Sequence, residues 1–175
     1  LAAREGALVP LIAETGGMNA MIVDSSALPE QVVKDVLRSA FNSAGQRCSA
    51  LRVLFVQTDV ADKIIELLAG AMAELCIGDP ARLATDVGPV IDDVARSNLA
   101  THAERMAQEG RLIYRCTLPP EAVNGSYFAP SAFEIERLEQ LRQEVFGPIL
   151  HVIRYSAAHL DRVIEAVNAS RYGLT

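Results

Sequence analysis

The chain has few cysteines, and their arrangement excludes two structural uses of that residue. Its 175 residues include three, Cys48, Cys76 and Cys116. An odd number at irregular spacing gives no disulfide framework, and the absence of a CxxC pair argues against a structural zinc site. The three histidines likewise show no metal-ligand spacing. We therefore expect no bound metal and a reducing, cytoplasmic environment.

The sequence also lacks a concentration of positive charge, a long apolar run and a phosphate-binding motif. Its net charge is −6, whereas nucleic-acid binding needs a concentrated basic surface. No apolar run reaches the ~18–20 residues that span a bilayer, and no signal peptide is visible. Neither a P-loop nor a GxGxxG turn is present. These absences predict no nucleic-acid partner for this segment, no membrane span and no phosphate cradle of its own.

Apolar residues, by contrast, are plentiful, and they alternate between strand-like and helix-like patterns. Half of the residues are hydrophobic, enough for the core of one domain. The alternation predicts βαβ units, and hence an α/β fold with an open, mostly parallel, doubly wound sheet and helices on both faces. Ligands of such sheets usually bind at the carboxyl ends of the strands, where we expect the site. The expected strands are 9–13, 20–23, 51–56, 112–114, part of 128–135, and 149–155, and the expected helices are 29–41, 59–74 with Thr58 as N-cap, 92–109 closed by Gly110, and 159–168.

Cys48 is the first candidate for chemistry. It lies between Phe41 and Ser49 in a polar, glycine-containing turn that joins an amphipathic helix to an apolar strand. The thiolate is the nucleophilic form of cysteine, and backbone N–H groups at such a junction favour an anion. Most lone cysteines are instead small buried hydrophobes. That interpretation suits Cys76 better, and Cys116 is structural or incidental, but for Cys48 both interpretations stay open.

Glu14 is the second candidate, 34 residues before Cys48 in the turn 13–17. The glycines at 16 and 17 allow close approach of the backbone to a ligand. A carboxylate at the end of an apolar strand can serve as a general base, although a glutamate on a turn is most often simply solvated. A nucleophile and a base on separate turns are typical of covalent catalysis.

A third unusual turn, Glu144 to Pro148, follows far downstream. It is either a plain connection in which Phe146 fills the core, or a turn that binds a ligand. In the second interpretation the Glu144 carboxylate accepts hydrogen bonds from sugar hydroxyls, and Phe146 covers a flat ring. The residues alone leave both interpretations open.

Taken together, these turns resemble the aldehyde dehydrogenase superfamily. Each motif is weak alone, but their combination with the Glu-to-Cys spacing is specific. The departures Thr15 and Met18, with Ser49 directly after the cysteine, are similar to the branch that oxidises L-glutamate γ-semialdehyde, the open form of 1-pyrroline-5-carboxylate, in proline catabolism. The matching segments, in order over nearly the whole chain, are Glu14-Thr15-Gly16-Gly17-Met18-Asn19-Ala20, Gly45-Gln46-Arg47-Cys48, Glu144-Val145-Phe146-Gly147-Pro148, and Asn168 through Thr175.

The resemblance implies a role for each matched residue. Cys48 corresponds to the nucleophile, whose thiolate attacks the aldehyde to give a thiohemiacetal and, once hydride has left to NAD⁺, a thioester. Glu14 corresponds to the base that activates the hydrolytic water. The Cys48 N–H would supply half of an oxyanion hole, and Ser49 would contact the substrate carboxylate. The residues implied in cofactor binding are Glu144 at the nicotinamide ribose, Phe146 at the nicotinamide ring, and Thr15.

The resemblance also implies that the chain is only part of an enzyme. Residues 1–175 correspond to the catalytic domain, truncated at both ends, with most of the NAD-binding domain absent. An asparagine that completes the oxyanion hole, and a loop that anchors the substrate carboxylate, would lie outside the chain. We therefore expect an incomplete NAD site, no turnover by this piece alone, and a parent that is a homo-oligomer. FAD would bind only in a separate proline dehydrogenase domain, if the parent is bifunctional.

Two other functions stay open. Cys48 and Glu14 could form the dyad of a thioesterase or acyltransferase, although no histidine, the usual activator, lies near Cys48 in the sequence. Alternatively, the fold could serve as a non-catalytic interaction module. Selective alkylation of Cys48 near neutral pH, relative to Cys76 and Cys116, would favour a tuned nucleophile.

Overall fold

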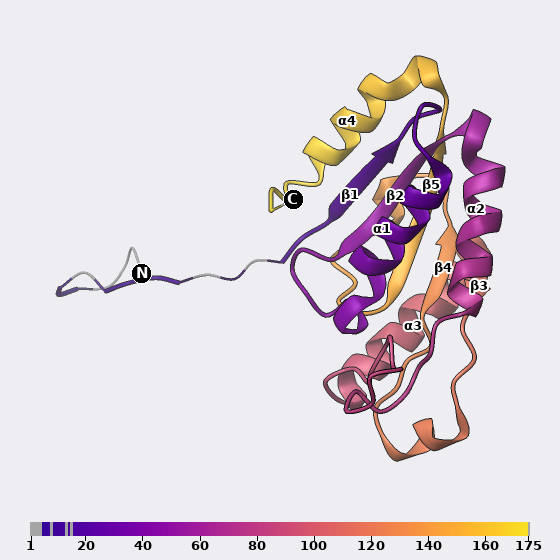
Figure 1. Ribbon diagram of the computed structural model, residues 1–175. Coiled ribbons are helices and arrows are strands. Elements are labelled where there is room, and N and C mark those ends of the chain that lie inside the picture. Colours follow the sequence, from indigo (N-terminus) through magenta and orange to yellow (C-terminus); the bar gives the residue numbers. More distant parts are fainter. Residues whose placement is uncertain (1–4, 8, 13, 15, 175) are drawn as a thin grey trace.

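A five-stranded sheet forms the centre of the molecule in the computed structural model, which describes residues 5–7, 9–12, 14 and 16–174 (Figure 1). Along the chain, the helices and strands are β1 (Asn19–Val23), α1 (Pro29–Phe41), β2 (Leu51–Gln57), α2 (Thr58–Ala73), α3 (Asp93–Glu109), β3 (Arg111–Arg115), β4 (Ser131–Glu134), β5 (Ile149–Tyr155) and α4 (Leu160–Ala169).

The sheet has the strand order β1-β2-β5-β4-β3. Its first four strands are parallel, and β3 runs antiparallel to β4 along one edge. The central strand β2 is buried at all seven positions, as expected for a parallel strand that is covered on both faces. The mostly parallel sheet predicted from the sequence is therefore confirmed.

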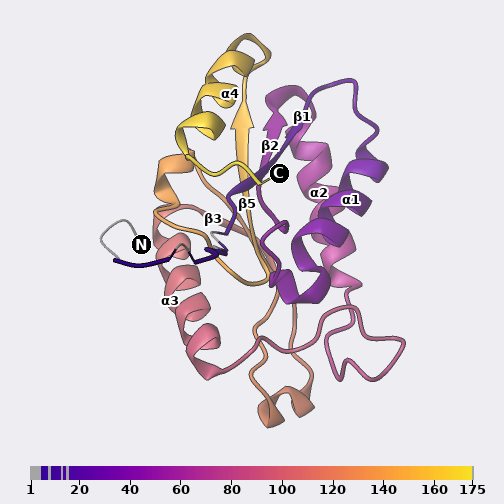
Figure 2. The same cartoon turned by 90° about the vertical axis from the view of Figure 1, so that its left-hand side faces the viewer.

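Helices cover both faces of the sheet, which also confirms the prediction. Helix α1 buries the stripe Val32, Val33, Val36 and Ala40, the spacing that places residues on one face of a helix. Its first residue is Pro29, which suits a position whose N–H has no helical partner. Figure 2 shows α1 and α2 on one side of the sheet and α3 and α4 on the other.

Two local predictions are wrong. Residues 9–12 form no strand, and Leu11 and Ile12 are exposed on a segment that leads away from the sheet (Figure 1). Ala13, the last residue of that expected strand, lies outside the described residues. Thr58 is not an N-cap but the first residue of α2, and its hydroxyl donates a hydrogen bond to the Tyr155 carbonyl at 3.0 Å. The Thr58 hydroxyl therefore bonds to β5 and does not cap the backbone of its own helix.

Candidate active site

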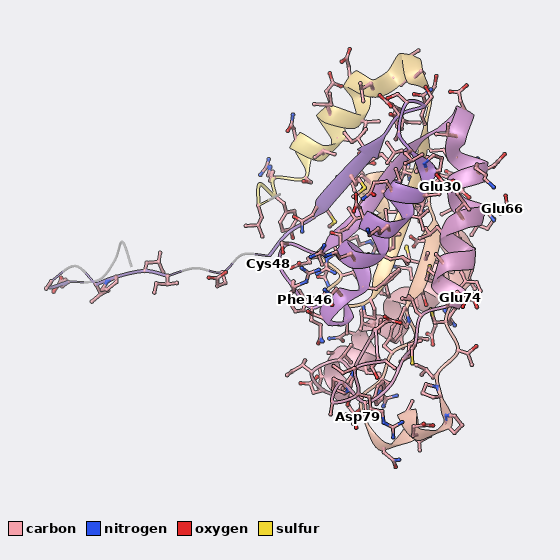
Figure 3. The ribbon with its side chains drawn as sticks, viewed as in Figure 1. Glu30, Cys48, Glu66, Glu74, Asp79 and Phe146 are labelled. Atoms are coloured by element: carbon pink, nitrogen blue, oxygen red, sulfur yellow. The ribbon has the colours of Figure 1, made fainter. Side chains whose placement is uncertain are left out.

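The three turns that the sequence singles out, at Glu14, Cys48 and Glu144, lie along one edge of the sheet, the edge formed by the amino ends of its parallel strands. They directly precede β1, β2 and β5, and because these strands are parallel neighbours, their amino ends meet at the same edge. The expectation of a site at the carboxyl ends of the strands is therefore wrong for these residues. In the view of Figure 3, Cys48 and Phe146 are labelled in the same region of the molecule, and the Arg52 side chain contacts both turns.

The Cys48 turn, residues 42–50, begins where α1 ends. A 3₁₀ turn places three successive residues, Ser43, Ala44 and Gly45, at φ of 57°, 51° and 65°. This left-handed conformation is costly for residues with a Cβ, so the chain reverses here at some expense in backbone energy. Cys48 follows on an exposed turn closed by a hydrogen bond from the Ala50 N–H to the Arg47 carbonyl, 3.0 Å long.

Cys48 and Glu14 line the same cavity, which has a volume of about 450 Å³. Its other lining residues are Gly16 and the C-terminal residues Arg171 to Leu174. The structure thus brings together a thiol and a carboxylate that are far apart in sequence, beside the C-terminal end of the described chain (Figure 1).

The glycines that follow Glu14 lie very close to the other two turns, where a side chain would not fit. A Cβ on Gly17 would overlap the carbonyl oxygen of Cys48, and a Cβ on Gly16, whose φ is +77°, would overlap the carboxylate of Glu144. The sequence predicts close approach at these glycines to a ligand, whereas in the structure the neighbours are other parts of the site. Gly16 and Gly17 therefore allow all three turns to meet.

The turn before β5 faces a second cavity, of about 560 Å³. Glu144 and Phe146 line this cavity together with His102 and Arg105 of α3. The Phe146 ring is 46% exposed and does not fill the core. Glu144 therefore lies between the two cavities, since its carboxylate also packs against Gly16.

Arg52 also belongs to this site, although no motif in the sequence indicates it. Although it lies in an apolar strand, its side chain is wholly buried and pairs with the Glu144 carboxylate at 3.3 Å. Burial lowers the pKa of its guanidinium, and the charge of Glu144 opposes this shift. The available signal was a single charge inside an otherwise apolar strand, because buried arginines are almost always paired.

The remaining candidates are placed as follows. Ser49 is exposed directly beside Cys48, and Thr15 lies outside the described residues. The interpretation of Cys76 as a buried hydrophobe is wrong, since it is exposed at the end of α2. Cys116 is the buried one, where desolvation raises the pKa of its thiol to about 11 and its Sγ lies 3.2 Å from the Met72 carbonyl. Of the two exposed thiols, only Cys48 lines the cavity with Glu14.

A histidine pair lies beneath the second cavity. The Nε2 atoms of His102 and His151 are 2.8 Å apart, and His151 Nδ1 lies 3.0 Å from the Arg52 carbonyl. Because a carbonyl only accepts, His151 Nδ1 carries the proton, and its Nε2 must accept from the His102 Nε2–H. His102 Nδ1 then accepts from Arg105 at 3.3 Å. Desolvation is the main reason that the pKa is lowered to about 4 in His102 and to about 3 in His151, so both rings are neutral at pH 7.

Within the ranges that the structure describes, no group of three or more histidine, cysteine or acidic side chains is arranged to hold a metal ion. The described helices also include none with the length and apolar character needed to cross a membrane.

Comparison with known proteins shows which family the chain resembles in sequence and fold. The profile of the aldehyde dehydrogenase family matches residues 1–175. The bifunctional protein PutA of Escherichia coli K12 is 53% identical over 98% of the chain, and that of Rhizobium meliloti is 54% identical over 97%. A 1-pyrroline-5-carboxylate dehydrogenase of Geobacillus kaustophilus is 34% identical over 94% of the chain.

A solved structure of a bifunctional proline utilization A protein superposes with a TM-score of 0.94 at 57% identity, over 99% of this chain and 17% of that one. The chain spans 13% of the E. coli PutA sequence, 14% of the Rhizobium one and 32% of the Geobacillus enzyme. Because the family profile matches the chain over its whole given length, the chain belongs to the aldehyde dehydrogenase family.

Proposed function

We propose that the chain is the nucleophile-bearing part of an NAD-dependent dehydrogenase that oxidises L-glutamate γ-semialdehyde to L-glutamate. The observation that carries the proposal is the shared cavity of Cys48 and Glu14, with the Glu144 turn packed against it. The names of the relatives, PutA and 1-pyrroline-5-carboxylate dehydrogenase, support the choice of this aldehyde.

Cys48 is the proposed nucleophile. Its thiol is exposed to the cavity, so a thiolate can reach the carbonyl carbon of an aldehyde there and form a thiohemiacetal. The Cys48 backbone N–H has no acceptor among the described residues, so it is free to donate to the oxygen that becomes negative. One such donor contributes on the order of 3 kcal/mol to a transition state of this kind.

Glu14 is the proposed base for the second half of the reaction. An exposed carboxylate on the same cavity can take a proton from a water molecule that attacks the thioester on Cys48. Hydrolysis then releases the carboxylic acid and regenerates the thiol. General base catalysis of this type contributes roughly 10²–10⁴-fold in rate.

The Glu144 turn fits one end of a nicotinamide cofactor. The Glu144 carboxylate offers acceptors for ribose hydroxyls, and the half-exposed Phe146 ring offers a flat apolar surface beside a cavity. When bound, NAD⁺ supplies the hydride acceptor for this oxidation. Thr15 remains a prediction as a third cofactor contact.

The substrate carboxylate is assigned to Ser49. Its position next to Cys48, on the exposed side of the turn, would let its hydroxyl donate a hydrogen bond to a carboxylate whose aldehyde end has reached Cys48. A thiol–histidine hydrolase is less well supported, because the described residues that line the Cys48 cavity include no histidine.

We further propose that the chain needs the rest of a larger enzyme for turnover. The relatives are several times longer than the part that this chain matches, and the described residues offer contacts only for the nicotinamide end of the cofactor. In this proposal the parent is a cytoplasmic homo-oligomer, and any FAD belongs to a separate proline dehydrogenase domain.

The test is NAD-dependent oxidation of 1-pyrroline-5-carboxylate by a full-length protein that carries this segment. We expect Cys48→Ala to abolish NADH formation and Cys76→Ala, which alters an exposed thiol outside the cavity, to leave it unchanged. Retained oxidation in the Cys48→Ala protein would rule out the assignment of the nucleophile. NADH formation by the 175-residue chain alone would rule out its dependence on further segments.

A further inference from the structure

We propose that Arg52 is a positioning residue that aims the Cys48 N–H into the cavity and fixes the Glu144 turn relative to it. The inference rests on the proposed role of Cys48 as a nucleophile that attacks a carbonyl. Arg52 is wholly buried, and every group that its terminal nitrogens contact belongs to one of these two turns.

On the Cys48 turn, Arg52 donates to two backbone carbonyls. Nη1 donates to the Gly45 carbonyl at 2.7 Å, and Nη2 donates to the Arg47 carbonyl at 3.0 Å. In a planar trans peptide the C=O of one residue and the N–H of the next point in opposite directions. Because the Arg47 carbonyl faces Arg52, the Cys48 N–H must point away from the buried guanidinium. In the proposed arrangement this is the direction of the cavity and of the oxyanion.

A second side chain holds the other side of Cys48. The amide nitrogen of Asn19, at the start of β1, donates to the Cys48 carbonyl at 2.6 Å and to the Ala50 carbonyl at 2.7 Å. The peptide planes on both sides of Cys48 are therefore fixed by buried side chains from two neighbouring strands. This leaves the turn little freedom to rotate its N–H groups.

On the other turn, the same guanidinium contacts three groups. Nη1 donates to the Gly147 carbonyl at 3.2 Å, Nη2 pairs with Glu144 at 3.3 Å, and the guanidinium carbon lies 5.5 Å from the centre of the Phe146 ring. The two turns also touch directly, since a Cβ on Gly45 would overlap the Gly147 carbonyl. Arg52 thus connects the proposed nucleophile with the proposed cofactor-binding residues.

Arg52 is itself held in place by the sheet. It lies in central β2, and its own carbonyl accepts the hydrogen bond from His151 of neighbouring β5. An arginine suits this position better than a lysine, because its planar guanidinium has five N–H donors in a fixed arrangement. A lysine ammonium would keep the charge near Glu144 but could not reach all of these carbonyls at once.

The test compares two reactions of the Cys48 thiolate in the 175-residue chain carrying Cys76→Ser, which removes the other exposed thiol. Iodoacetamide alkylates sulfur by displacing iodide and forms no oxyanion. With p-nitrophenyl acetate, the S–C bond forms at a carbonyl, the oxygen becomes negative, and p-nitrophenolate then leaves. Only the second reaction uses the Cys48 N–H, so the ratio of the two rates reports its orientation.

We expect Arg52→Lys to lower the acetylation rate at least about tenfold relative to the alkylation rate, since loss of one oxyanion donor costs roughly 10²–10³-fold. The matched control is Arg154→Lys, at a β5 arginine that pairs with Glu134 and Asp62, and it should leave the ratio unchanged. An equal fall in both rates, or no change in either, would overturn the inference. Neither rate needs NAD⁺ or the semialdehyde, so failure here leaves the proposed dehydrogenase function untouched. Failure of the proposed function is recognised separately, by retained oxidation in the Cys48→Ala full-length protein.

If Arg52→Lys shows no cooperative unfolding in urea, the unaltered chain answers the same question by NMR hydrogen exchange. We expect slow exchange of the Arg52 guanidinium hydrogens compared with those of exposed Arg82, together with fast exchange of the Cys48 amide. Fast exchange at Arg52, or protection of the Cys48 amide, would contradict the proposed orientation.

Discussion

Gly45 and Arg52 show how much of the site depends on single residues. The sequence predicts a glycine-containing turn before Cys48, but it does not reveal that Gly45 adopts a positive φ or touches Gly147. Arg52 was not predicted as a site residue, because its contacts come from turns distant in sequence and only the folded chain brings these together. Spacing along the chain does not predict contacts between residues that are distant in sequence.

Gly45→Ala should destabilise the chain. The left-handed conformation costs a residue with a Cβ roughly 1–2 kcal/mol, and the added methyl group would overlap the Gly147 carbonyl. We therefore expect a loss of at least about 2 kcal/mol in the free energy of unfolding, measured in urea. Gly70→Ala is the control, because this exposed position in α2 has open space around it, and it should gain up to about 1 kcal/mol.

The neutral histidine pair makes stability depend on pH. The pKa values of about 4 for His102 and about 3 for His151 lie below the ordinary value of 6.5. Between these pKa values and pH 6.5, the unfolded chain therefore binds more protons than the folded chain. Stability is then fully present above about pH 6.5 and falls as the pH drops toward 4. The charges of Arg105 and Arg52 favour the neutral rings, while Glu109 opposes this for His102.

This pH dependence can be measured by urea unfolding at pH 7 and pH 4.5. At about 1.4 kcal/mol per pKa unit, each histidine contributes a loss of roughly 2.5 kcal/mol over this interval, so we expect on the order of 5 kcal/mol from the pair. The double variant His102→Gln/His151→Gln should lose correspondingly less, because glutamine can donate and accept hydrogen bonds without taking up a proton. The control is His159→Gln, at an exposed residue before α4. An unchanged acid sensitivity in the double variant would show that other groups cause it.

At the scale of whole elements, the local patterns predict most of the fold. The expected bounds of α1 and β5 match the structure to the residue, because an amphipathic stripe after a proline and a continuous apolar run are strong local signals. Of the strand expected at 9–13, the described residues 9–12 form none, because an apolar sequence alone does not supply a neighbouring strand to pair with. Whether the site lies at the amino or the carboxyl ends of the strands depends on which turns meet in the folded sheet. Local sequence patterns do not contain that information.

Helix α3 offers a test of a cap predicted closely from the sequence. The sequence predicts this helix from residue 92, and in the structure Asp92 is its N-cap, whose carboxylate accepts a hydrogen bond from the Ala95 N–H at 2.7 Å. We expect Asp92→Ala to lower the free energy of unfolding by about 1 kcal/mol. Glu104→Ala, at an exposed position within the same helix, should change it by less than about 0.5 kcal/mol. Equal effects of the two changes would show that the cap contributes nothing.

At the scale of the whole molecule, the two cavities at one edge of the sheet divide the proposed chemistry. The 450 Å³ cavity holds the thiol and the carboxylate, and the 560 Å³ cavity holds the cofactor candidates of the Glu144 turn. Since the chain spans only 13% of the E. coli PutA sequence, we expect other segments of a full-length enzyme to complete both.

The 175-residue chain should therefore retain a reactive Cys48 without dehydrogenase activity. We expect iodoacetamide near pH 7 to label Cys48 faster than the other exposed thiol, Cys76, and to leave buried Cys116 unlabelled. Peptide mass spectrometry after timed labelling measures all three sites in one experiment. Faster labelling of Cys76 than of Cys48 would show that the turn does not activate its thiol.

The most direct test of the central claim is to trap the covalent intermediate in a full-length protein that carries this segment and Glu14→Gln. With 1-pyrroline-5-carboxylate and NAD⁺, the account predicts a burst of about one NADH per site, turnover slowed by roughly 10²-fold or more, and a glutamyl thioester on Cys48 detected by peptide mass spectrometry. Undiminished turnover, or the absence of an adduct on Cys48, would contradict it.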